Sequence, residues 1–301
     1  MADIVDNFGY DGKVAHITGA GNGLGREHAL LLAGRGAQVV VNDLGGSVAG
    51  DGADSGPAQQ VADEIEAAGG VAVASTASVS TRAGGEDIVR TAVDAFGRVD
   101  IVINNAGILR DKAFHNLTDD LLDPVLDVHL RGAFYVTQPA WKLMRDQGYG
   151  RVVNTSSAAG IFGNFGQTNY GAAKMGLVGF TRVLAQEGAK YGIKANVIAP
   201  GAKTRMTEDL MGAMSDKLDP RLVSPLVAFL AHEDCPVSGQ AFSVGGGRVA
   251  QIFIGVTQGI FDAELSVETV RDRWEELCDQ TGYVVPTSAT DELGLLFPHL
   301  S

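Results

Sequence analysis

Short runs of apolar, mostly β-branched residues alternate with longer amphipathic segments along most of the 301-residue chain. Apolar runs of this kind are typical of strands that are buried on both faces of a parallel sheet. Their alternation with helices predicts a doubly wound, three-layer α/β fold of the Rossmann type, with right-handed crossovers. We expect about seven strands, near 13–18, 37–43, 71–76, 99–104, 150–156, 194–199 and 240–244, and helices near 23–35, 57–69, 83–96, 118–146, 168–190 and 220–232.

Two segments depart from this alternation. Residues 44–56 form a long glycine-rich loop after the second expected strand. We therefore predict one Rossmann domain over 1–250 and a C-terminal extension over 251–301, with a single helix near 267–280 that Ser266 caps. We expect Trp274 and Tyr283 of the extension to be buried against the core or a neighbouring subunit.

Charge and cysteine content limit the classes of partner. The formal net charge of −13 argues against nucleic acid and against an anionic membrane surface. No apolar run reaches the length of a membrane-spanning helix. The first residues are acidic, where a targeting peptide would be basic, and the last four, PHLS, are not an SKL-type peroxisomal address. Cys235 and Cys278 have no metal-site spacing, so we expect free thiols, no metal and a cytoplasmic protein.

A glycine-rich turn joins the first expected strand to the first helix. Glycines let the backbone turn sharply and approach a pyrophosphate, which the N–H groups and dipole of the helix N-terminus stabilise. This placement predicts a dinucleotide site rather than a tight turn alone. The residues concerned are Thr18, Gly19, Asn22, Gly23, Leu24 and Gly25.

Asp43 ends the second expected strand, eighteen residues after Gly25. A carboxylate here can accept hydrogen bonds from the adenosine ribose hydroxyls and would repel a 2′-phosphate. No arginine lies in the next dozen residues, so NAD is favoured over NADP. The alternative role for Asp43 is to cap its own loop.

The fourth expected strand ends in Asn104, followed by Asn105, Ala106 and Gly107. An asparagine at this position can cross-link neighbouring strands, so a structural role is expected for Asn104. The small residues that follow leave room for the cofactor.

Tyr170 and Lys174 are four residues apart, on one face of an expected helix, and Ser157 precedes them. A free tyrosine titrates near pH 10, about three units too high for proton exchange at neutral pH. We expect the neighbouring ammonium to lower the pKa of Tyr170. Ser157 would orient a substrate oxygen. The three residues predict oxidation of an alcohol, with hydride transfer to a nicotinamide.

Over roughly residues 8–250 these motifs together resemble the short-chain dehydrogenase/reductase family. The family pattern TGxxxGxG is matched from Thr18 to Gly25, NNAG at 104–107, and the Ser-Tyr-Lys spacing by Ser157, Tyr170 and Lys174. The resemblance implies that Lys174 also holds the nicotinamide ribose. It implies that the backbone of Ser78 and Val79, after the third strand, contacts the cofactor. It also implies cofactor contacts from a Pro-Gly turn and the threonine that follows, which are Pro200, Gly201 and Thr204.

Further segments resemble the (3R)-hydroxyacyl-CoA dehydrogenase domain of peroxisomal multifunctional β-oxidation enzymes, also called type 4 17β-hydroxysteroid dehydrogenase, and its stand-alone bacterial relatives. They are VVVNDLGG (39–46), NNAGILRDKAF (104–114), VHLRGAF (128–134), GNFGQTNYGAAK (163–174) and RMT (205–207). His129 stands where most of the family has asparagine. The resemblance implies a catalytic position for His129 and leaves open whether its imidazole joins the proton relay or is structural.

The resemblance implies NAD-dependent oxidation of a (3R)-hydroxyacyl-CoA to the 3-ketoacyl-CoA in β-oxidation, or of a related steroid side chain. A free hydroxysteroid or other secondary alcohol is the alternative substrate. A non-catalytic NAD-binding regulatory or scaffold module is the alternative of another class, against which the complete Ser157–Tyr170–Lys174 set argues. The family implies a homodimer or homotetramer, and a separate hydratase is a possible partner. Expected substrate contacts are Arg110, Lys112, Lys203 and Arg205 for CoA, and Met206, Leu210, Met211 and Met214 for the acyl chain.

Overall fold

Eight strands form one sheet in the computed structural model, which describes residues 8–202 and 218–299. The order across the sheet is β3-β2-β1-β4-β5-β6-β7-β8, and β1 to β7 pair in parallel. The doubly wound α/β fold predicted from the sequence is therefore confirmed. The strands are β1 (Val14–Thr18), β2 (Gln38–Asn42), β3 (Val71–Ser75), β4 (Ile101–Asn104), β5 (Gly150–Thr155), β6 (Ile193–Pro200), β7 (Ala241–Gly245) and β8 (Arg248–Ile252).

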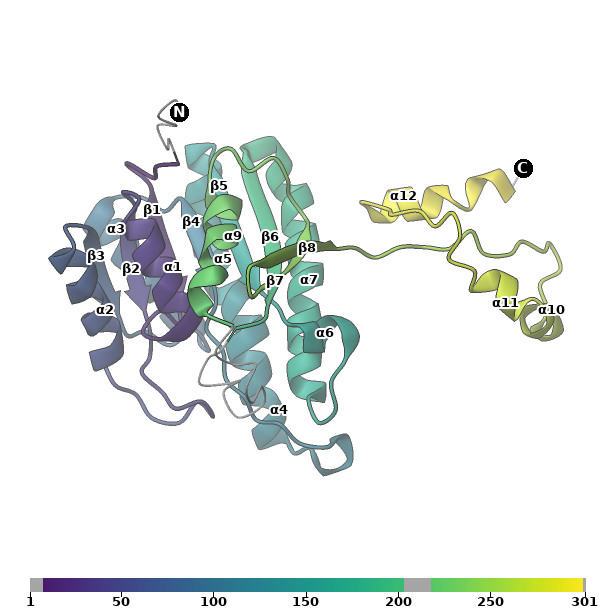
Figure 1. Ribbon diagram of the computed structural model, residues 1–301, viewed down its shortest axis with the longest axis horizontal. Helices are drawn as coiled ribbons and strands as arrows, with labels where there is room; N and C mark the ends of the chain where they lie inside the picture. The colour runs from purple at the N-terminus through teal and green to yellow at the C-terminus, as the bar shows by residue number, and fades with distance from the viewer. Residues whose placement is uncertain (1–7, 203–217, 300–301) are drawn as a thin grey trace. The chain divides into compact units, whose positions relative to one another are not determined.

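Helices cover both faces of the sheet (Figure 1). One face carries α1 (Gly23–Ala33), α2 (Gly56–Ala67) and α9 (Ser224–Ala231), and the other carries α3 (Arg82–Phe96), α5 (Gly132–Gln147) and α7 (Thr168–Gly188). Shorter elements are α4 (Asp119–Leu126), α6 (Ala158–Phe162) and the 3-10 turns Phe114–Asn116, Ala189–Tyr191 and Pro220–Leu222.

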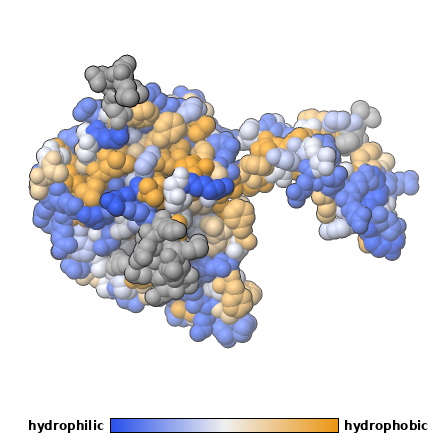
Figure 2. Space-filling view, in the orientation of Figure 1, coloured by the Kyte–Doolittle hydropathy of each residue, from blue (hydrophilic) through white to orange (hydrophobic). Residues whose placement is uncertain are grey.

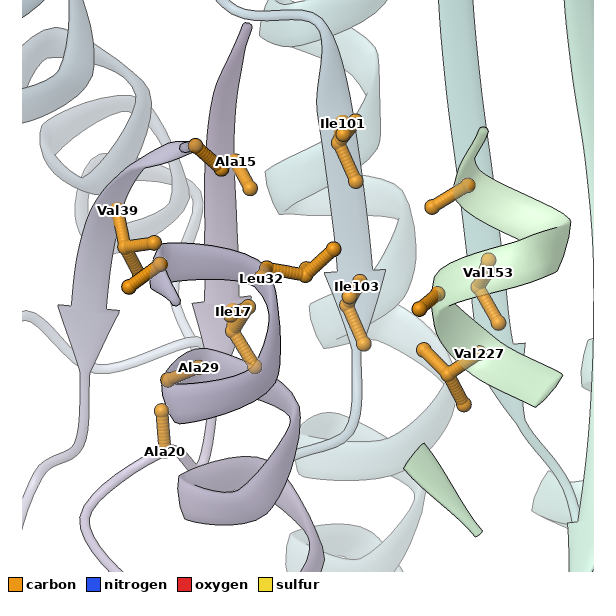
Figure 3. Packing of buried hydrophobic residues seen from close by; sticks show 14 of the residues in the cluster. Ala15, Ile17, Ala20, Ala29, Leu32, Val39, Ile101, Ile103, Val153 and Val227 are labelled. Atoms are coloured by element: carbon orange, nitrogen blue, oxygen red, sulfur yellow. The ribbon is translucent and has the colours of Figure 1, made fainter. Parts of the chain in front are cut away.

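Each face has its own apolar core. Figure 3 shows the first, where Ala29 and Leu32 of α1 face Ile17 of β1 and Ile103 of β4, all of them buried. The second core packs α3 and α5 against the opposite face, around Ile88 and Val136. Apolar residues also extend to the outer surface of α9, as Figure 2 shows. Burial on both faces explains why the strands read as uninterrupted apolar runs.

The direction of the crossovers changes at β1, which lies between β2 and β4. In such sheets the loops at the carboxyl ends of the two central strands diverge and leave a crevice between them. The fold therefore places the glycine-rich turn after β1 beside the Asn105–Gly107 segment after β4.

The helix expected over 118–146 is divided in the structure. A turn of π-helix, Asp127–Arg131, separates α4 from α5. Such a turn holds one more residue than an α-helical turn, and it brings His129 to the interior. The sequence analysis also missed β8, an edge strand that follows a turn at Gly246 and Gly247, with φ of +56° and +81°.

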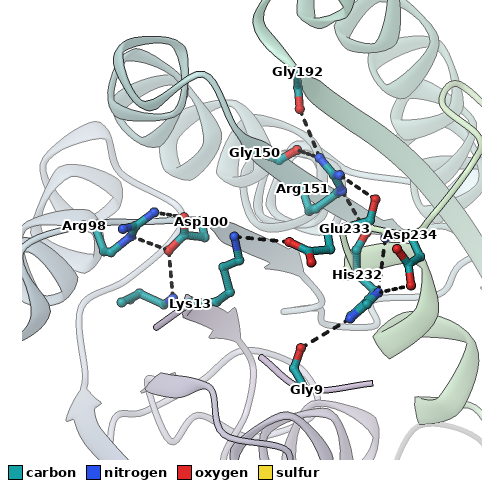
Figure 4. A network of polar contacts seen from close by, with 11 residues as sticks. Gly9, Lys13, Arg98, Asp100, Gly150, Arg151, Gly192, His232, Glu233 and Asp234 are labelled. Atoms are coloured by element: carbon teal, nitrogen blue, oxygen red, sulfur yellow. Dashed lines mark hydrogen bonds and ion pairs between the residues drawn. The ribbon is translucent and has the colours of Figure 1, made fainter. Parts of the chain in front are cut away.

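Polar groups tie the strands together at the amino end of the sheet, away from the crevice (Figure 4). The fully buried carboxylate of Asp100 accepts hydrogen bonds from the Val14 N–H and from two nitrogens of Arg98. The buried guanidinium of Arg151 donates to four backbone carbonyls, those of Gly150, Gly192, His232 and Glu233. These hydrogen bonds offset the cost of removing the two charges from water.

The chain divides into two compact units, Met1–Gln251 and Ile252–Ser301. The second contains α10 (Val267–Asp272), α11 (Trp274–Leu277), α12 (Ala289–Gly294) and the 3-10 turn Phe297–His299. The expected helix 267–280 is thus broken, at Arg273, although Ser266 does cap its start by accepting from the Thr269 N–H. Trp274 and Tyr283 are exposed, and their contact with a neighbouring subunit stays a prediction.

Across the part of the chain that the structure describes, no helix has both the length and the apolar character of a membrane span.

His16 and His28 are two of the four buried histidines among the described residues of the first unit. His16 lies in β1, and neither of its ring nitrogens has a hydrogen-bond partner among the described residues. His28 of α1 contacts the Ser224 hydroxyl through Nδ1, at 2.8 Å. Burial disfavours the charged imidazole and lowers the pKa of both histidines to about 3.

Unfolding should therefore become easier in acid. An unfolded histidine binds a proton below about pH 6.5, whereas each of these stays neutral in the folded protein down to about pH 3. Between these values the unfolded chain binds more protons, so the free energy of unfolding falls with decreasing pH, by up to about 1.4 kcal/mol per pH unit for each histidine. Urea unfolding of wild type and His16→Leu at pH 7, 5.5 and 4.5 should show a smaller pH slope in the variant. The exposed His115→Gln serves as control, and equal slopes for all three proteins would contradict this prediction.

Candidate active site

A cavity of about 830 Å³ opens at the carboxyl ends of the central strands. Of the predicted site residues, Thr18, Gly25 and the expected CoA contact Lys112 do not line it. Outside the described residues lie Thr204, Lys203, Arg205, Met206, Leu210, Met211 and Met214. The lining includes Gly19, Asn22, Gly23, Leu24, Asp43, Ser78, Val79, Asn105, Ala106, Gly107, His129, Ser157, Tyr170, Lys174, Pro200 and Gly201.

The glycine-rich turn, or glycine cradle, packs so closely against its surroundings that Gly19 and Gly25 leave no room for a side chain. Gly19 has a φ of +66°, and a Cβ there would lie 2.8 Å from the Ala106 Cα. A Cβ on Gly25 would lie 2.2 Å from the Gly19 carbonyl oxygen. Helix α1 begins at Gly23 without a side-chain cap, which leaves N–H groups of its first turn for a ligand. These features fit the pyrophosphate of a dinucleotide.

Thr18 and Asn105 support this cradle from behind. The Thr18 hydroxyl accepts hydrogen bonds from the N–H groups of Asn105 and Ala106, at 3.0 and 3.1 Å. The Asn105 amide donates back to the carbonyls of Thr18 and Gly19, at 3.0 and 3.1 Å. The ends of β1 and β4 are thereby held together.

Asp43 follows β2 and lines the cavity. Its two carboxylate oxygens accept hydrogen bonds from the N–H groups of Gly21 and Gly45, at 2.8 and 2.7 Å. The alternative role of Asp43, capping its own loop, is therefore present. Each oxygen has a second lone pair, so the carboxylate can still accept from ribose hydroxyls.

The loop 44–56 is tied to the segment after β4. The Leu109 N–H donates to the Val48 carbonyl, at 3.0 Å. The guanidinium of Arg110 donates to the Ala49 and Asp120 carbonyls, each at 2.8 Å, and to the Asp51 carboxylate, at 3.2 Å. Arg110 was expected to meet CoA, but here two of its donors hold this loop and a third holds the start of α4.

Ser157, Tyr170 and Lys174 meet on one wall of the cavity. Ser157 follows β5 and caps α6, whereas Tyr170 and Lys174 lie on successive turns of α7. The Ser157 hydroxyl is hydrogen-bonded to the Tyr170 phenol. The Lys174 Nζ lies 5.4 Å from the centre of the Tyr170 ring and donates to the Thr155 carbonyl at 2.6 Å.

Burial has a larger effect on this wall than the sequence analysis expected. Burial raises the pKa of Tyr170. The hydrogen bond from Ser157 partly offsets this increase, and the negative charge of Asp111 adds to it. Burial also lowers the pKa of Lys174 to about 7, because a buried ammonium loses its hydration. In the protein without cofactor, the expected lowering of the Tyr170 pKa is therefore absent.

His129 packs directly against the ring of Tyr170. The two rings meet edge to face, with centroids 5.1 Å apart. The Nε2 atom lies 2.8 Å from the carbonyl oxygen and 3.0 Å from the nitrogen of Ile108. Burial and the charge of Lys174 hold the pKa of His129 well below its usual value, so the imidazole is neutral.

Four residues that hold this wall in place were not predicted from the sequence. The carbonyl of Thr155 accepts from Lys174, and the hydroxyl of Ser156 donates to the Lys174 carbonyl at 2.7 Å. Their only signal is that they directly precede Ser157. Asp111 and Gln167, hydrogen-bonded at 2.7 Å, had no signal at all.

Comparison with known proteins agrees with this geometry. The family model of the short chain dehydrogenases matches residues 13–214. The chain belongs to the short-chain dehydrogenase family. It is an oxidoreductase, and dehydrogenases of this family generally use NAD or NADP.

Three proteins are similar to this chain over most of its length. A short-chain type dehydrogenase/reductase of Mycobacterium tuberculosis is 51% identical to this chain, over 91% of this chain and 96% of the relative. The hydroxyacyl-CoA dehydrogenase ChsB1 of the same organism is 43% identical, over 80% of each chain. The structure of full-length peroxisomal multifunctional enzyme type 2 from Drosophila melanogaster matches with a TM-score of 0.82 and 37% identity, over 97% of this chain and 50% of that one.

This short-chain dehydrogenase thus spans half the length of the multifunctional enzyme. The resemblance predicted from the sequence, to the family and to the multifunctional enzymes and their bacterial relatives, is confirmed.

Arg110→Ala tests whether the loop 44–56 contributes to dinucleotide binding. The change removes three hydrogen bonds from a charged donor, and such bonds are worth about 1.5–3 kcal/mol each when both partners are well ordered. We expect the affinity for NAD to fall about tenfold, since part of this energy is recovered by water. Fluorescence titration measures the change, with the exposed Arg90→Ala as control. Unchanged NAD affinity with weakened acyl-CoA affinity would instead support the CoA contact.

Proposed function

We propose that this dehydrogenase uses NAD to oxidise the (3R)-hydroxyl group of an acyl-CoA to a ketone, a step of β-oxidation. The observation that carries the proposal is the convergence of Ser157, Tyr170 and Lys174 on one wall of the cavity that also contains the glycine cradle. A proton-transfer group and a dinucleotide cradle in one cavity are the two parts that alcohol oxidation needs.

The choice of NAD rests on Asp43. Its carboxylate lies at the cavity wall, where a 2′-phosphate would meet a negative charge. Arg110 is the only arginine or lysine besides Lys174 among the described residues that line the cavity, and it is engaged with the loop. Ser78 and Val79 would contact adenine, and Pro200 and Gly201 the nicotinamide end.

The chemistry follows from what Tyr170 and its neighbours contact. When bound, NAD supplies the acceptor for the hydride that leaves the carbinol carbon. The Tyr170 oxygen takes the proton of the substrate hydroxyl, while Ser157 hydrogen-bonds the same substrate oxygen. Lys174 stabilises the tyrosine in its charged form, and its pKa of about 7 lets Nζ hold or release a proton near neutral pH.

We assign His129 a structural role. A buried imidazole with a lowered pKa does not readily take up a proton to become a cation, so it is a poor proton relay. It can still orient a neighbouring group. A cavity of about 10 Å³, room for one water, is bordered by His129, Thr155 and Lys174. Among the described atoms His129 Nδ1 and Thr155 Oγ1 lack a hydrogen-bond partner, so both are suited to hold such a water beside Lys174.

The acyl-CoA substrate is supported by the relatives rather than by a contact. One relative is named a hydroxyacyl-CoA dehydrogenase, and another is a multifunctional enzyme of peroxisomes. A free hydroxysteroid would use the same Ser157, Tyr170 and Lys174. The alternatives therefore differ in substrate and not in mechanism.

The first experiment offers NAD with (3R)-hydroxyacyl-CoA, (3S)-hydroxyacyl-CoA and a free hydroxysteroid, and follows NADH formation. We expect turnover of the (3R)-thioester only. Tyr170→Phe should bind NAD within about twofold of wild type and lose about three orders of magnitude in turnover, because the proton acceptor is gone. Turnover of the free alcohol alone would discard the acyl-CoA proposal, and an active Tyr170→Phe would refute the role of the phenol.

Asp43→Asn tests the cofactor preference. Asparagine keeps an oxygen for the Gly21 or Gly45 N–H but removes the negative charge. We expect the ratio of kcat/KM for NAD over NADP to fall at least about tenfold, because the repulsion of the 2′-phosphate is relieved. Thermal unfolding controls for a disturbed loop, and an unchanged ratio would remove Asp43 from the discrimination.

A further inference from the structure

Asn169, the residue before the catalytic tyrosine, is 1% exposed, and its side chain makes three hydrogen bonds. The amide nitrogen donates to the carbonyls of Arg110, at 2.9 Å, and Leu121, at 2.8 Å. The amide oxygen accepts from the backbone N–H of Tyr170, at 2.8 Å. One buried side chain therefore connects three segments of the chain: the segment after β4, helix α4 and the first turn of α7.

The contact with the Tyr170 N–H has a local cause. The first N–H groups of a helix have no carbonyl partner within it, and α7 starts at Thr168 with no side-chain cap from Gln167. Asn169 supplies the missing acceptor. Asparagine is otherwise a poor residue for a helix interior, so its place in the first turn is explained by its hydrogen bonds.

The segment that Asn169 holds is itself part of the cavity wall. The backbone of Lys112 donates to the Gly166 carbonyl at 2.8 Å, just before α7. The carbonyl of Arg110 accepts from Asn169, while its guanidinium holds Ala49 and Asp51 of the loop. Arg110 and Asn169 thus form a continuous connection between the loop at the adenosine end and the tyrosine at the reacting end.

We propose that Asn169 is a positioning residue for Tyr170, acting from behind the phenol. By fixing the backbone nitrogen of Tyr170 to the wall, it keeps the phenol in hydrogen-bond reach of Ser157 and beside Lys174. The Ser157 hydrogen bond is the contact that lowers the pKa of Tyr170. Loss of the anchor at Asn169 therefore weakens that contact and raises the pKa of the phenol. Its consequence for turnover rests on the proposed function, whereas its effect on the phenol does not.

Asn169→Leu removes the three hydrogen bonds and keeps a side chain of four heavy atoms branched at Cγ. The matched control is Asn196→Leu in β6, since Asn196 is also fully buried, donates to the Val237 carbonyl at 3.0 Å and accepts from the Gln240 N–H at 3.1 Å. Asn169→Ser, whose hydroxyl can still accept from the Tyr170 N–H, is the milder variant if the leucine variant fails to fold.

The first readout needs no substrate. The proteins are labelled with 3-fluorotyrosine, whose fluorine lowers the phenol pKa, and the Tyr170 resonance is assigned by its loss in Tyr170→Phe. We expect the Tyr170 resonance of Asn169→Leu to titrate about 0.5–1 pH unit higher than that of wild type. The shift should be smaller in Asn169→Ser, and Asn196→Leu should titrate as wild type does. Identical titration in wild type and both Asn169 variants would overturn the proposal.

The second readout is turnover of the (3R)-hydroxyacyl-CoA. We expect kcat to fall about tenfold or more in Asn169→Leu, with the Kd for NAD within about twofold, because misplacement of a reacting group by a fraction of an ångström is costly. Asn196→Leu should keep kcat. A loss of NAD affinity without a change in kcat would overturn the positioning role. If wild type turns over no hydroxyacyl-CoA, the proposed function fails and the fluorine titration still decides the role of Asn169.

Discussion

The site depends on the close approach of the ends of β1 and β4. The Thr18 hydroxyl accepts from two backbone N–H groups after β4, and Gly19 lets the two backbones come within contact distance. The sheet order makes this approach possible, because β1 and β4 are neighbours at the point where the crossovers change direction. A side chain on Gly19 would clash with the Ala106 backbone, and one on Gly25 would clash with the Gly19 carbonyl, so either would push the turn away from the end of β4.

Burial then sets the chemistry of the catalytic wall. Lys174 is buried and Tyr170 is half-buried at the cavity wall, and loss of hydration disfavours the charged form of each and brings the pKa of Lys174 to about 7. The neutral His129 packs on the tyrosine, and Thr155 holds the lysine by its backbone carbonyl. The wall is therefore rigid and poorly hydrated, so the charges that appear during proton transfer interact strongly with their neighbours.

Much of the fold could be predicted because its signals are local. Each strand is an apolar run of a few residues, and the seven expected strands are present. The missed elements depend on context. The π-helical turn at 127–131 and the break at Arg273 interrupt patterns that read as continuous helices, and β8 exists because a neighbouring strand is available for pairing. The glycine turn, Ser157, Tyr170 and Lys174 were found because their spacing is short and their chemistry is distinctive.

The sequence by itself determined the class of fold, the position of the glycine-rich turn and the Tyr170–Lys174 pair, since periodicity and short spacing carry this information. Only the tertiary structure decided the pKa values of the pair and the hydrogen bonds that hold the two residues in place. The pKa of Tyr170 follows from burial by segments distant in the chain, and the partners of Arg110 and Asn169 lie up to about sixty residues away. Hydrogen bonds between distant segments leave no periodic pattern in a sequence, because they exist only after the sheet has brought those segments together.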